Sequence, residues 1–110
     1  MAYNKYGNVK IKVDGHTFDS KKEADRYYEL KLMQRAGMIT DLELQPEYIL
    51  QEGFKKGGKT WRPIIYRADF RYKDERGNVV VEDVKGFRTK EFEIKQKLFE
   101  YKYKERLTLI

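Results

Sequence analysis

The chain has 110 residues, 40% of them hydrophobic, which suits a single domain over residues 1–110 with one modest core and excludes a disordered chain. It contains no cysteine and one histidine, His16, which excludes disulfides and thiol chemistry and argues against histidine-based catalysis or metal binding. The formal net charge is +6, and this excess favours a polyanionic partner, nucleic acid first, because lysine and arginine attract phosphates.

The first predicted elements are a hairpin and a helix. Residues 8–13 alternate valine or isoleucine with lysine, which predicts a strand with one solvent face, and the Asp-Gly that follows predicts a turn into a short second strand. Ser20 and Glu23 match the S-x-x-E capping box, so a helix is expected over residues 21–36.

Strands are expected through most of the middle of the chain. Residues 38–50 alternate apolar and polar side chains and are broken at Pro46, which predicts a strand with a bend or an edge position. Residues 52–60 are rich in glycine and lysine and predict a flexible basic turn. Residues 61–72 and 79–85 then predict two strands joined by a polar turn.

The chain is predicted to end with a second helix and a last strand. Thr89 is the expected N-cap of a helix that runs to about residue 102, and residues 107–110 form the final short strand. The predicted order is a short N-terminal hairpin followed by α-β-β-β-α-β, a mixed α/β domain with helices packed on a sheet.

No segment of the sequence suggests a membrane. The N-terminus lacks an apolar stretch of signal-peptide length, and no apolar run reaches 18 residues. We therefore expect a soluble, cytoplasmic protein with no membrane partner.

Two carboxylates are expected to meet at the end of the valine strand. Side chains alternate between the faces of a strand, so Asp83 and Lys85 share a face and Glu82 lies on the other, which makes Asp83 the preferred acid. If the turn closes a symmetric antiparallel hairpin, Asp69 lies opposite Asp83, whereas a shift of two residues makes them diagonal neighbours.

The preceding strand is expected to sort its side chains in the same way. Alternation places Asp69 on one face, together with two arginines. The other face is apolar and is predicted to carry Tyr66, Ala68, Phe70 and Tyr72.

Facing carboxylates repel each other and need a positive partner. Mg²⁺ prefers hard oxygen ligands, usually one or two carboxylates with water and substrate phosphate. A lysine two residues beyond one acid can orient an attacking water or neutralise developing charge, which suits phosphodiester hydrolysis. The alternative is an ion-paired strand end in which Asp83 and Lys85 are solvated and have no chemical role.

These residues resemble the signature of the PD-(D/E)XK nuclease superfamily, an acid on the second core strand and (D/E)-x-K on the third. The matching residues are Asp69 in Y-R-A-D-F and Asp83-Val84-Lys85 in V-E-D-V-K-G. The overall pattern is similar to small phage-encoded proteins of the superfamily and to Holliday-junction resolvases. The resemblance implies a restriction-endonuclease-like α/β core, Mg²⁺ or Mn²⁺ as cofactor and DNA as partner. It also implies endonuclease activity in phage or mobile-element recombination, replication or packaging, in the host cytoplasm if phage-encoded.

The resemblance also implies roles for individual residues. Asp69 and Asp83 would bind metal together with the backbone carbonyl of Val84, and Lys85 would assist the attacking water. Glu23 is similar in position to a glutamate that the superfamily often adds from its first helix. The capping box explains Glu23 equally well without catalysis.

Five lysines are candidates for contacts with phosphates, three between two strands and two on the second helix: Lys55, Lys56, Lys59, Lys95 and Lys97. Most aromatic residues are expected to pack in the core and not to stack on bases. Two other functions stay open, a non-catalytic nucleic-acid-binding module on the same fold and a structural or assembly protein. A chain this small can rely on a homodimer or a protein partner for targeting.

Overall fold

The computed structural model describes residues 10–84 and 88–110, and this part of the chain has a mixed α/β fold, which confirms that prediction. The helices are α1 (Lys21–Arg35) and α2 (Lys90–Lys102). The strands, in chain order, are β1 (Ile11–Val13), β2 (His16–Phe18), β3 (Thr40–Leu44), β4 (Glu47–Gln51), β5 (Phe54–Lys56), β6 (Lys59–Trp61), β7 (Ile64–Arg67), β8 (Phe70–Lys73), β9 (Val79–Asp83) and β10 (Leu107–Leu109). Neither described helix has the length and apolar character needed to cross a membrane.

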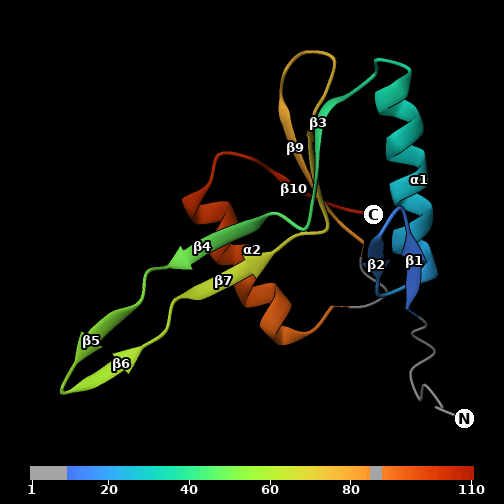
Figure 1. Cartoon of the computed structure of the whole chain (residues 1–110). Coiled ribbons are helices and arrows are strands. Elements are labelled where there is room, and N and C mark those ends of the chain that lie inside the picture. The colour runs from blue at the N-terminus through green and yellow to red at the C-terminus, as the bar shows by residue number, and fades with distance from the viewer. Residues whose placement is uncertain (1–9, 85–87) are drawn as a thin grey trace, which may run out of the picture.

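A four-stranded sheet in the order β10-β9-β8-β3 forms the centre of the fold (Figure 1). β8 pairs antiparallel with both β3 and β9, whereas β10 pairs parallel with β9 after a crossover through α2. Such a parallel connection needs a dozen or more residues, and the helix supplies them. The elements that build or cover this sheet therefore follow the order α1-β3-β8-β9-α2-β10.

The helix ends follow the local signals of the sequence. Ser20 Oγ accepts a hydrogen bond from the Glu23 N–H (3.1 Å), and Thr89 Oγ1 accepts one from the Phe92 N–H (3.0 Å), so both predicted N-caps are confirmed. Gly37 follows the C-cap of α1 with φ of +78°, a conformation that favours glycine and ends the helix.

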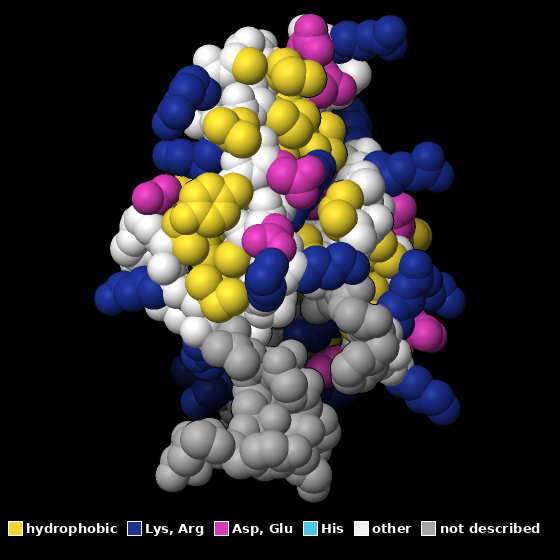
Figure 2. Space-filling model, turned by 90° about the vertical axis from the view of Figure 1, so that its right-hand side faces the viewer, with side chains coloured by type: hydrophobic (Ala, Val, Ile, Leu, Met, Phe, Trp, Pro, Cys, Tyr) yellow, Lys and Arg dark blue, Asp and Glu magenta, His cyan; other side chains and the backbone are white. Residues whose placement is uncertain are grey.

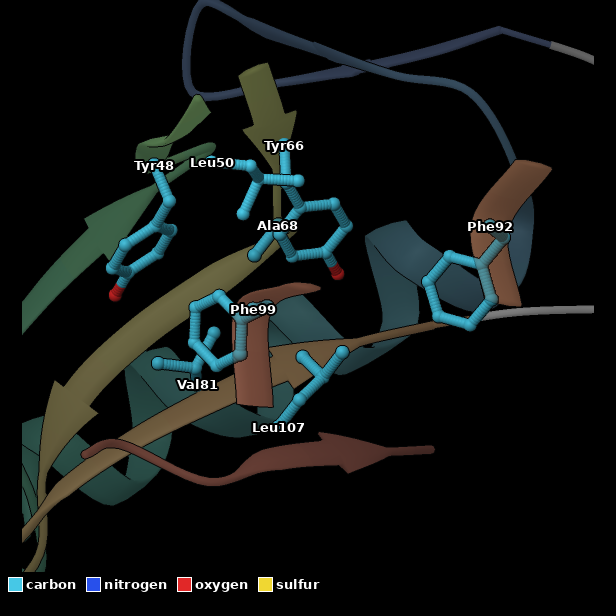
Figure 3. Close-up of a cluster of buried hydrophobic side chains, with 8 residues drawn as sticks. All are labelled: Tyr48, Leu50, Tyr66, Ala68, Val81, Phe92, Phe99 and Leu107. Carbon is cyan, nitrogen blue, oxygen red and sulfur yellow. The ribbon is translucent and has the colours of Figure 1, made fainter. Parts of the chain in front are cut away.

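Two hydrophobic clusters lie between the sheets and the two helices. The first packs α2 against β9, β10 and the β4–β7 pair, and its members are shown in Figure 3: Tyr48, Leu50, Tyr66, Ala68, Val81, Phe92, Phe99 and Leu107. The second packs α1 against β2 and β8, and its members are Phe18, Ala24, Tyr27, Leu30, Ile39, Phe70 and Tyr72. Two apolar residues of α1, Tyr28 and Leu32, stay exposed on its outer face, and hydrophobic side chains gather on this side of the molecule in Figure 2.

The segments predicted as strands over residues 38–50 and 61–72 are both interrupted. The first is interrupted at Pro46, where the bend was predicted, whereas the prediction of one continuous strand over residues 61–72 was wrong. The first divides at Gln45, whose φ is +51°, and at Pro46, which has no N–H to donate to a sheet. The second divides twice, between β6 and β7 at residues 62–63 and between β7 and β8 at residues 68–69. Two backbone hydrogen bonds hold the breaks side by side, from the Gln45 N–H to the Asp69 carbonyl (2.9 Å) and from the Ala68 N–H to the Pro46 carbonyl (3.0 Å).

The break between β7 and β8 also overturns the predicted apolar face of residues 66–72. Tyr66 and Ala68 belong to the cluster under α2, whereas Phe70 and Tyr72 belong to the cluster under α1. Alternation holds only within a regular strand, and the bend at Asp69 turns the chain from one layer to the other.

The predicted flexible turn over residues 52–60 is a second correction, because it contains a hairpin. β5 pairs antiparallel with β6, and Gly57 and Gly58 form its turn with φ of +58° and +74°. Two consecutive residues with positive φ match the twist of a tight hairpin, and glycine adopts them without a steric penalty. Figure 1 shows the hairpin projecting from the end of the β4–β7 pair.

A buried ion pair joins α1 to the central sheet. Arg26 donates from Nε to Glu82 Oε1 (2.8 Å) and from a terminal nitrogen to Oε2 (2.6 Å), and the Tyr72 hydroxyl donates to the same carboxylate. The Glu82 side chain is 1% exposed. The hydrogen bonds from Arg26 to this carboxylate raise the pKa of Arg26. Glu82 therefore lies on the α1 side of β9, opposite to the face of Asp83, as alternation predicts.

We expect Arg26→Met to lower the free energy of unfolding by about 3–5 kcal/mol, because it leaves the carboxylate of Glu82 buried without its cation. Urea unfolding followed by far-ultraviolet circular dichroism measures the change. Lys21→Met is the matched control, since the Lys21–Asp25 pair (3.1 Å) is exposed and should cost less than about 1 kcal/mol. Equal losses in the two variants would contradict a structural role for the buried pair.

Candidate active site

The register of β8 and β9 brings two acidic residues to the same level of the sheet. Phe70 pairs with Glu82, and the Asp69 N–H donates to the Glu82 carbonyl (3.0 Å). Continuing this register by one residue places Asp69 opposite Asp83, the last residue of β9, and this is the symmetric register that the sequence predicts.

Each carboxylate is held by a different group of the protein. Asp69 Oδ2 accepts a hydrogen bond from the Val84 N–H (2.6 Å). Asp83 is fully buried, and its Oδ2 accepts a hydrogen bond from the hydroxyl of Tyr66. The two carboxyls are close enough for the charge of Asp83 to raise the pKa of Asp69, which is half-buried beside the end of β9.

Glu23 is the third acid of this cluster. It lies in the first turn of α1, is 5% exposed, and is close enough to Asp69 for its charge to raise the pKa of that carboxyl. Its backbone N–H donates to the Ser20 cap (3.1 Å). Asp69 and Asp83 therefore lie together, and Glu23 lies near enough for its charge to act on Asp69.

The electrostatics of the cluster favour protonation. The pKa of Asp69 is raised to about 8, mainly by burial and further by the charges of Asp83 and Glu23, and the Val84 N–H opposes this rise. Burial also raises the pKa of Tyr66 above its ordinary value, so its hydroxyl stays protonated and donates to Asp83.

The chemistry of the cluster fits a hard divalent cation. The arginines of the neighbouring elements are engaged elsewhere, Arg26 with Glu82 and Arg67 with Glu47 (2.8 Å). Within residues 10–84 and 88–110, no three acidic or histidine side chains converge closely enough to enclose an ion by themselves. Mg²⁺ commonly takes one or two carboxylates and completes its shell with water and phosphate, so the carboxylate oxygens present suit Mg²⁺ or Mn²⁺.

A pocket of about 440 Å³ opens beside the cluster, between β7 and the start of α2. Tyr66 lines it, and so do two cations, Arg67 and Lys95, and two acids, Glu47 and Glu91, of which Glu47 pairs with Arg67. Lys97 is exposed outside this pocket, because two residues along a helix turn the side chain by about 200°. Of the two helix lysines predicted to contact phosphates, only Lys95 is therefore placed next to the cluster.

The other predicted site residues divide into three groups. Lys85 lies outside the described residues. Val84 is half-buried and contributes its N–H to Asp69, while the metal-binding role of its carbonyl stays a prediction. The three remaining lysines of the predicted phosphate-binding set lie on the β5–β6 hairpin: Lys55, Lys56 and Lys59.

Tyr66 is the site residue that the sequence reasoning missed. It was assigned to an apolar strand face, and its ring does pack in the first cluster, where Figure 3 shows the hydroxyl pointing away from the backbone of β7. The sequence does not distinguish a tyrosine that only packs in the core from one whose hydroxyl also donates a hydrogen bond to an acid. Its position three residues before Asp69 was the only available signal.

A comparison with known families finds one match. A family model described as "Protein of unknown function (DUF1064)" matches residues 3–110, nearly the entire chain and all the residues of the cluster. No curated protein matches the chain.

Without divalent metal, we expect the free energy of unfolding to fall as the pH rises from about 4 to 8. Between the ordinary pKa of 3.8 and the raised value of about 8 for Asp69, the folded state binds more protons than the unfolded state. The slope should reach at most about 1.4 kcal/mol per pH unit. Urea unfolding in EDTA at several pH values measures it.

Asp83→Asn is the matched variant for this measurement. It removes one of the charges that raise the pKa of Asp69, so the slope should become shallower. A pH profile that is identical in the two proteins would contradict electrostatic coupling between these acids.

Proposed function

This chain belongs to the DUF1064 family, and we propose that it is a metal-dependent endonuclease that hydrolyses phosphodiester bonds of DNA. The observation that carries the proposal is the convergence of Asp69 and Asp83 at the buried end of β9, with Glu23 beside them. Burying like charges together is destabilising, and a bound cation would offset their repulsion.

The arrangement of elements supports membership of the PD-(D/E)XK nuclease superfamily. The order α1-β3-β8-β9-α2-β10 is that of a restriction-endonuclease-like core. Asp69 directly precedes β8, and Asp83 ends β9 with Val84 and Lys85 after it, which are the positions of the superfamily's acid and its D-x-K.

In the proposed mechanism, the residues of this chain hold and orient the reacting groups. Asp69 and Asp83 would hold Mg²⁺ or Mn²⁺, with the Val84 carbonyl as a further ligand. When bound, the ion polarises the phosphoryl oxygen and lowers the pKa of a coordinated water. The Val84 N–H keeps Asp69 in place, and Tyr66 does the same for Asp83. Lys85 orients the attacking water or neutralises charge that develops on the phosphate.

The surroundings of the cluster support a nucleic-acid substrate. The neighbouring pocket contains Lys95, and although Glu47 and Glu91 balance its two cations, the chain as a whole has a net charge of +6. Phosphates of a DNA strand in this pocket would meet Lys95 while the scissile bond faces Asp69 and Asp83. By resemblance we place the activity in phage or mobile-element recombination, replication or packaging.

A DNA-binding module without catalysis is the alternative. Such a module needs basic residues on its surface, but it has no need for buried acids. A protein that only binds a polyanion gains nothing from burying Asp69 and Asp83 together, because both acids repel phosphate. The cluster therefore favours the enzyme.

We expect the purified protein to nick supercoiled DNA in Mg²⁺ or Mn²⁺ and to be inactive in EDTA. Asp69→Asn, Asp83→Asn and Lys85→Ala should each lower the rate by about 100-fold or more, because each removes a group that acts on the metal or the attacking water. Gel electrophoresis of nicked and linear products over time gives the rates.

Asp41→Asn is the matched control for the nicking assay, since Asp41 is an exposed acid whose φ of +56° asparagine accepts well. Circular dichroism establishes that every variant is folded. Activity that survives in folded Asp83→Asn would refute the proposed site, and metal-independent DNA binding without nicking would identify the non-catalytic module.

Glu23→Gln separates the two explanations of that residue. Glutamine serves the capping box as well as glutamate does, so a purely structural role predicts unchanged stability and unchanged nicking. We expect stability to be kept and the nicking rate to fall about tenfold or more, because the amide has no charge to offer a cation. Thermal unfolding and the nicking assay, run on the same preparation, decide between them.

A further inference from the structure

The β5–β6 hairpin carries an aromatic and cationic face that the active site does not explain. All six residues of its strands are exposed, and the hairpin projects from the end of the β4–β7 pair (Figure 1). Phe54 pairs with Trp61 and Lys56 with Lys59, so these four side chains share one face of the hairpin.

The two aromatic rings are stacked and half open to solvent. Their centroids are 5.9 Å apart, the interplanar angle is 11°, and Phe54 and Trp61 are 44% and 43% exposed. Neither belongs to a hydrophobic cluster of the fold. Cross-strand stacking stabilises a hairpin and explains the contact between the rings, but it leaves the rest of each ring surface accessible to a partner.

The cations on the hairpin point to the charge of that partner. Lys59 Nζ lies 4.1 Å from the centroid of the Trp61 ring, and Lys56 sits directly opposite Lys59. Like charges across a strand pair repel, and a polyanion would relieve the repulsion. Residues 52–62 contain four basic residues and one acid, which favours phosphate.

The base of the hairpin is closely packed, which gives the arm a defined direction. A Cβ atom on Gly53 would lie 3.0 Å from Pro63 Cδ and 3.0 Å from the Trp61 carbonyl oxygen, so a larger residue there would push these neighbours away. Trp61 precedes Asp69 by eight residues. An extended chain of that length spans at most about 26 Å, or about eight nucleotides of one DNA strand.

We propose that the β5–β6 hairpin is a DNA-binding arm that recognises unpaired bases. Phe54 and Trp61 stack on a base that has left the helix, while Lys56 and Lys59, on the same face, contact the flanking phosphates; Lys55 lies on the opposite face of the hairpin. Bases inside a duplex already stack on both faces, so only single-stranded, flapped or branched DNA offers a free base. The substrate class of the nuclease is therefore DNA with unpaired nucleotides within about eight nucleotides of the cut, and this last step rests on the proposed function.

Trp61 is the only tryptophan of the chain, so its fluorescence reports on the arm directly. In EDTA, the protein is titrated with a duplex that contains three unpaired thymines, with the fully paired duplex, and with inorganic polyphosphate. Stacking should quench Trp61 only with the unpaired bases and tighten binding roughly tenfold over the paired duplex. Equal affinity for all three ligands, or binding of unpaired bases with no change in fluorescence, overturns the proposal.

Variants separate stacking from charge, with binding measured by the anisotropy of labelled DNA. Trp61→Leu should abolish the preference for unpaired bases, whereas Trp61→Phe, which keeps an aromatic face, should retain most of it. Lys59→Gln should weaken binding to paired and unpaired DNA alike and lower the salt dependence. Tyr101→Ala removes an aromatic ring that is 92% exposed on α2 and should change nothing. Retention of the preference in Trp61→Leu, or its loss in Tyr101→Ala, refutes the assignment.

The arm and the nuclease fail in distinguishable ways. Asp83→Asn should lose nicking and keep the full Trp61 response, since the two sites use different residues. A Trp61 response in a wild-type protein that never nicks DNA supports the arm and refutes the enzyme. Nicking with no preference for unpaired bases supports the enzyme and refutes the arm.

Discussion

The pairing of β8 with β9 holds two carboxylates side by side in a place where water does not compensate their repulsion. The Asp69 N–H is bonded to the backbone of β9, and Asp69 Oδ2 accepts the Val84 N–H, so the acid cannot turn away without breaking the strand pair. Phe70 and Val81, which are completely buried on the two sides of the sheet, hold the same pair in register. Apolar packing thus maintains an electrostatic arrangement that is unfavourable by itself, as functional sites commonly require.

Glu82 and Asp83 are neighbours on β9, and the face of the sheet to which each side chain points decides which groups it contacts. Glu82 points to α1, where Arg26 and Tyr72 satisfy its carboxylate, and it contributes to the structure. Asp83 points to the opposite side, where it accepts a hydrogen bond from Tyr66 and lies beside a second acid, Asp69. The hydrophobic strand ends in acids for two different reasons, one structural and one that we propose is catalytic.

The paired breaks at Gln45 and at Ala68–Asp69 separate the central sheet from the β4–β7 pair. On one side of the breaks, β3 and β8 belong to the central sheet, and on the other side, β4 and β7 form a separate pair that leads to the arm. A positive φ at Gln45 is an uncommon conformation for a residue with a side chain, and the hydrogen bond to Asp69 helps to hold it. The same bend that ends the sheet also orients Asp69.

The sequence by itself determined the caps of both helices, the α/β class, the order of the main elements and the register that sets Asp69 level with Asp83, because these depend on local signals and on the length of the turn between two strands. Tertiary structure alone decided where the long strands break, which layer Tyr66 joins and that Arg26 neutralises Glu82. Those outcomes depend on hydrogen bonds and packing between residues far apart in the chain, such as Arg26 with Glu82 and Gln45 with Asp69. A local sequence pattern does not identify such partners, because the contacts that stabilise them form only when the helices and sheets pack together.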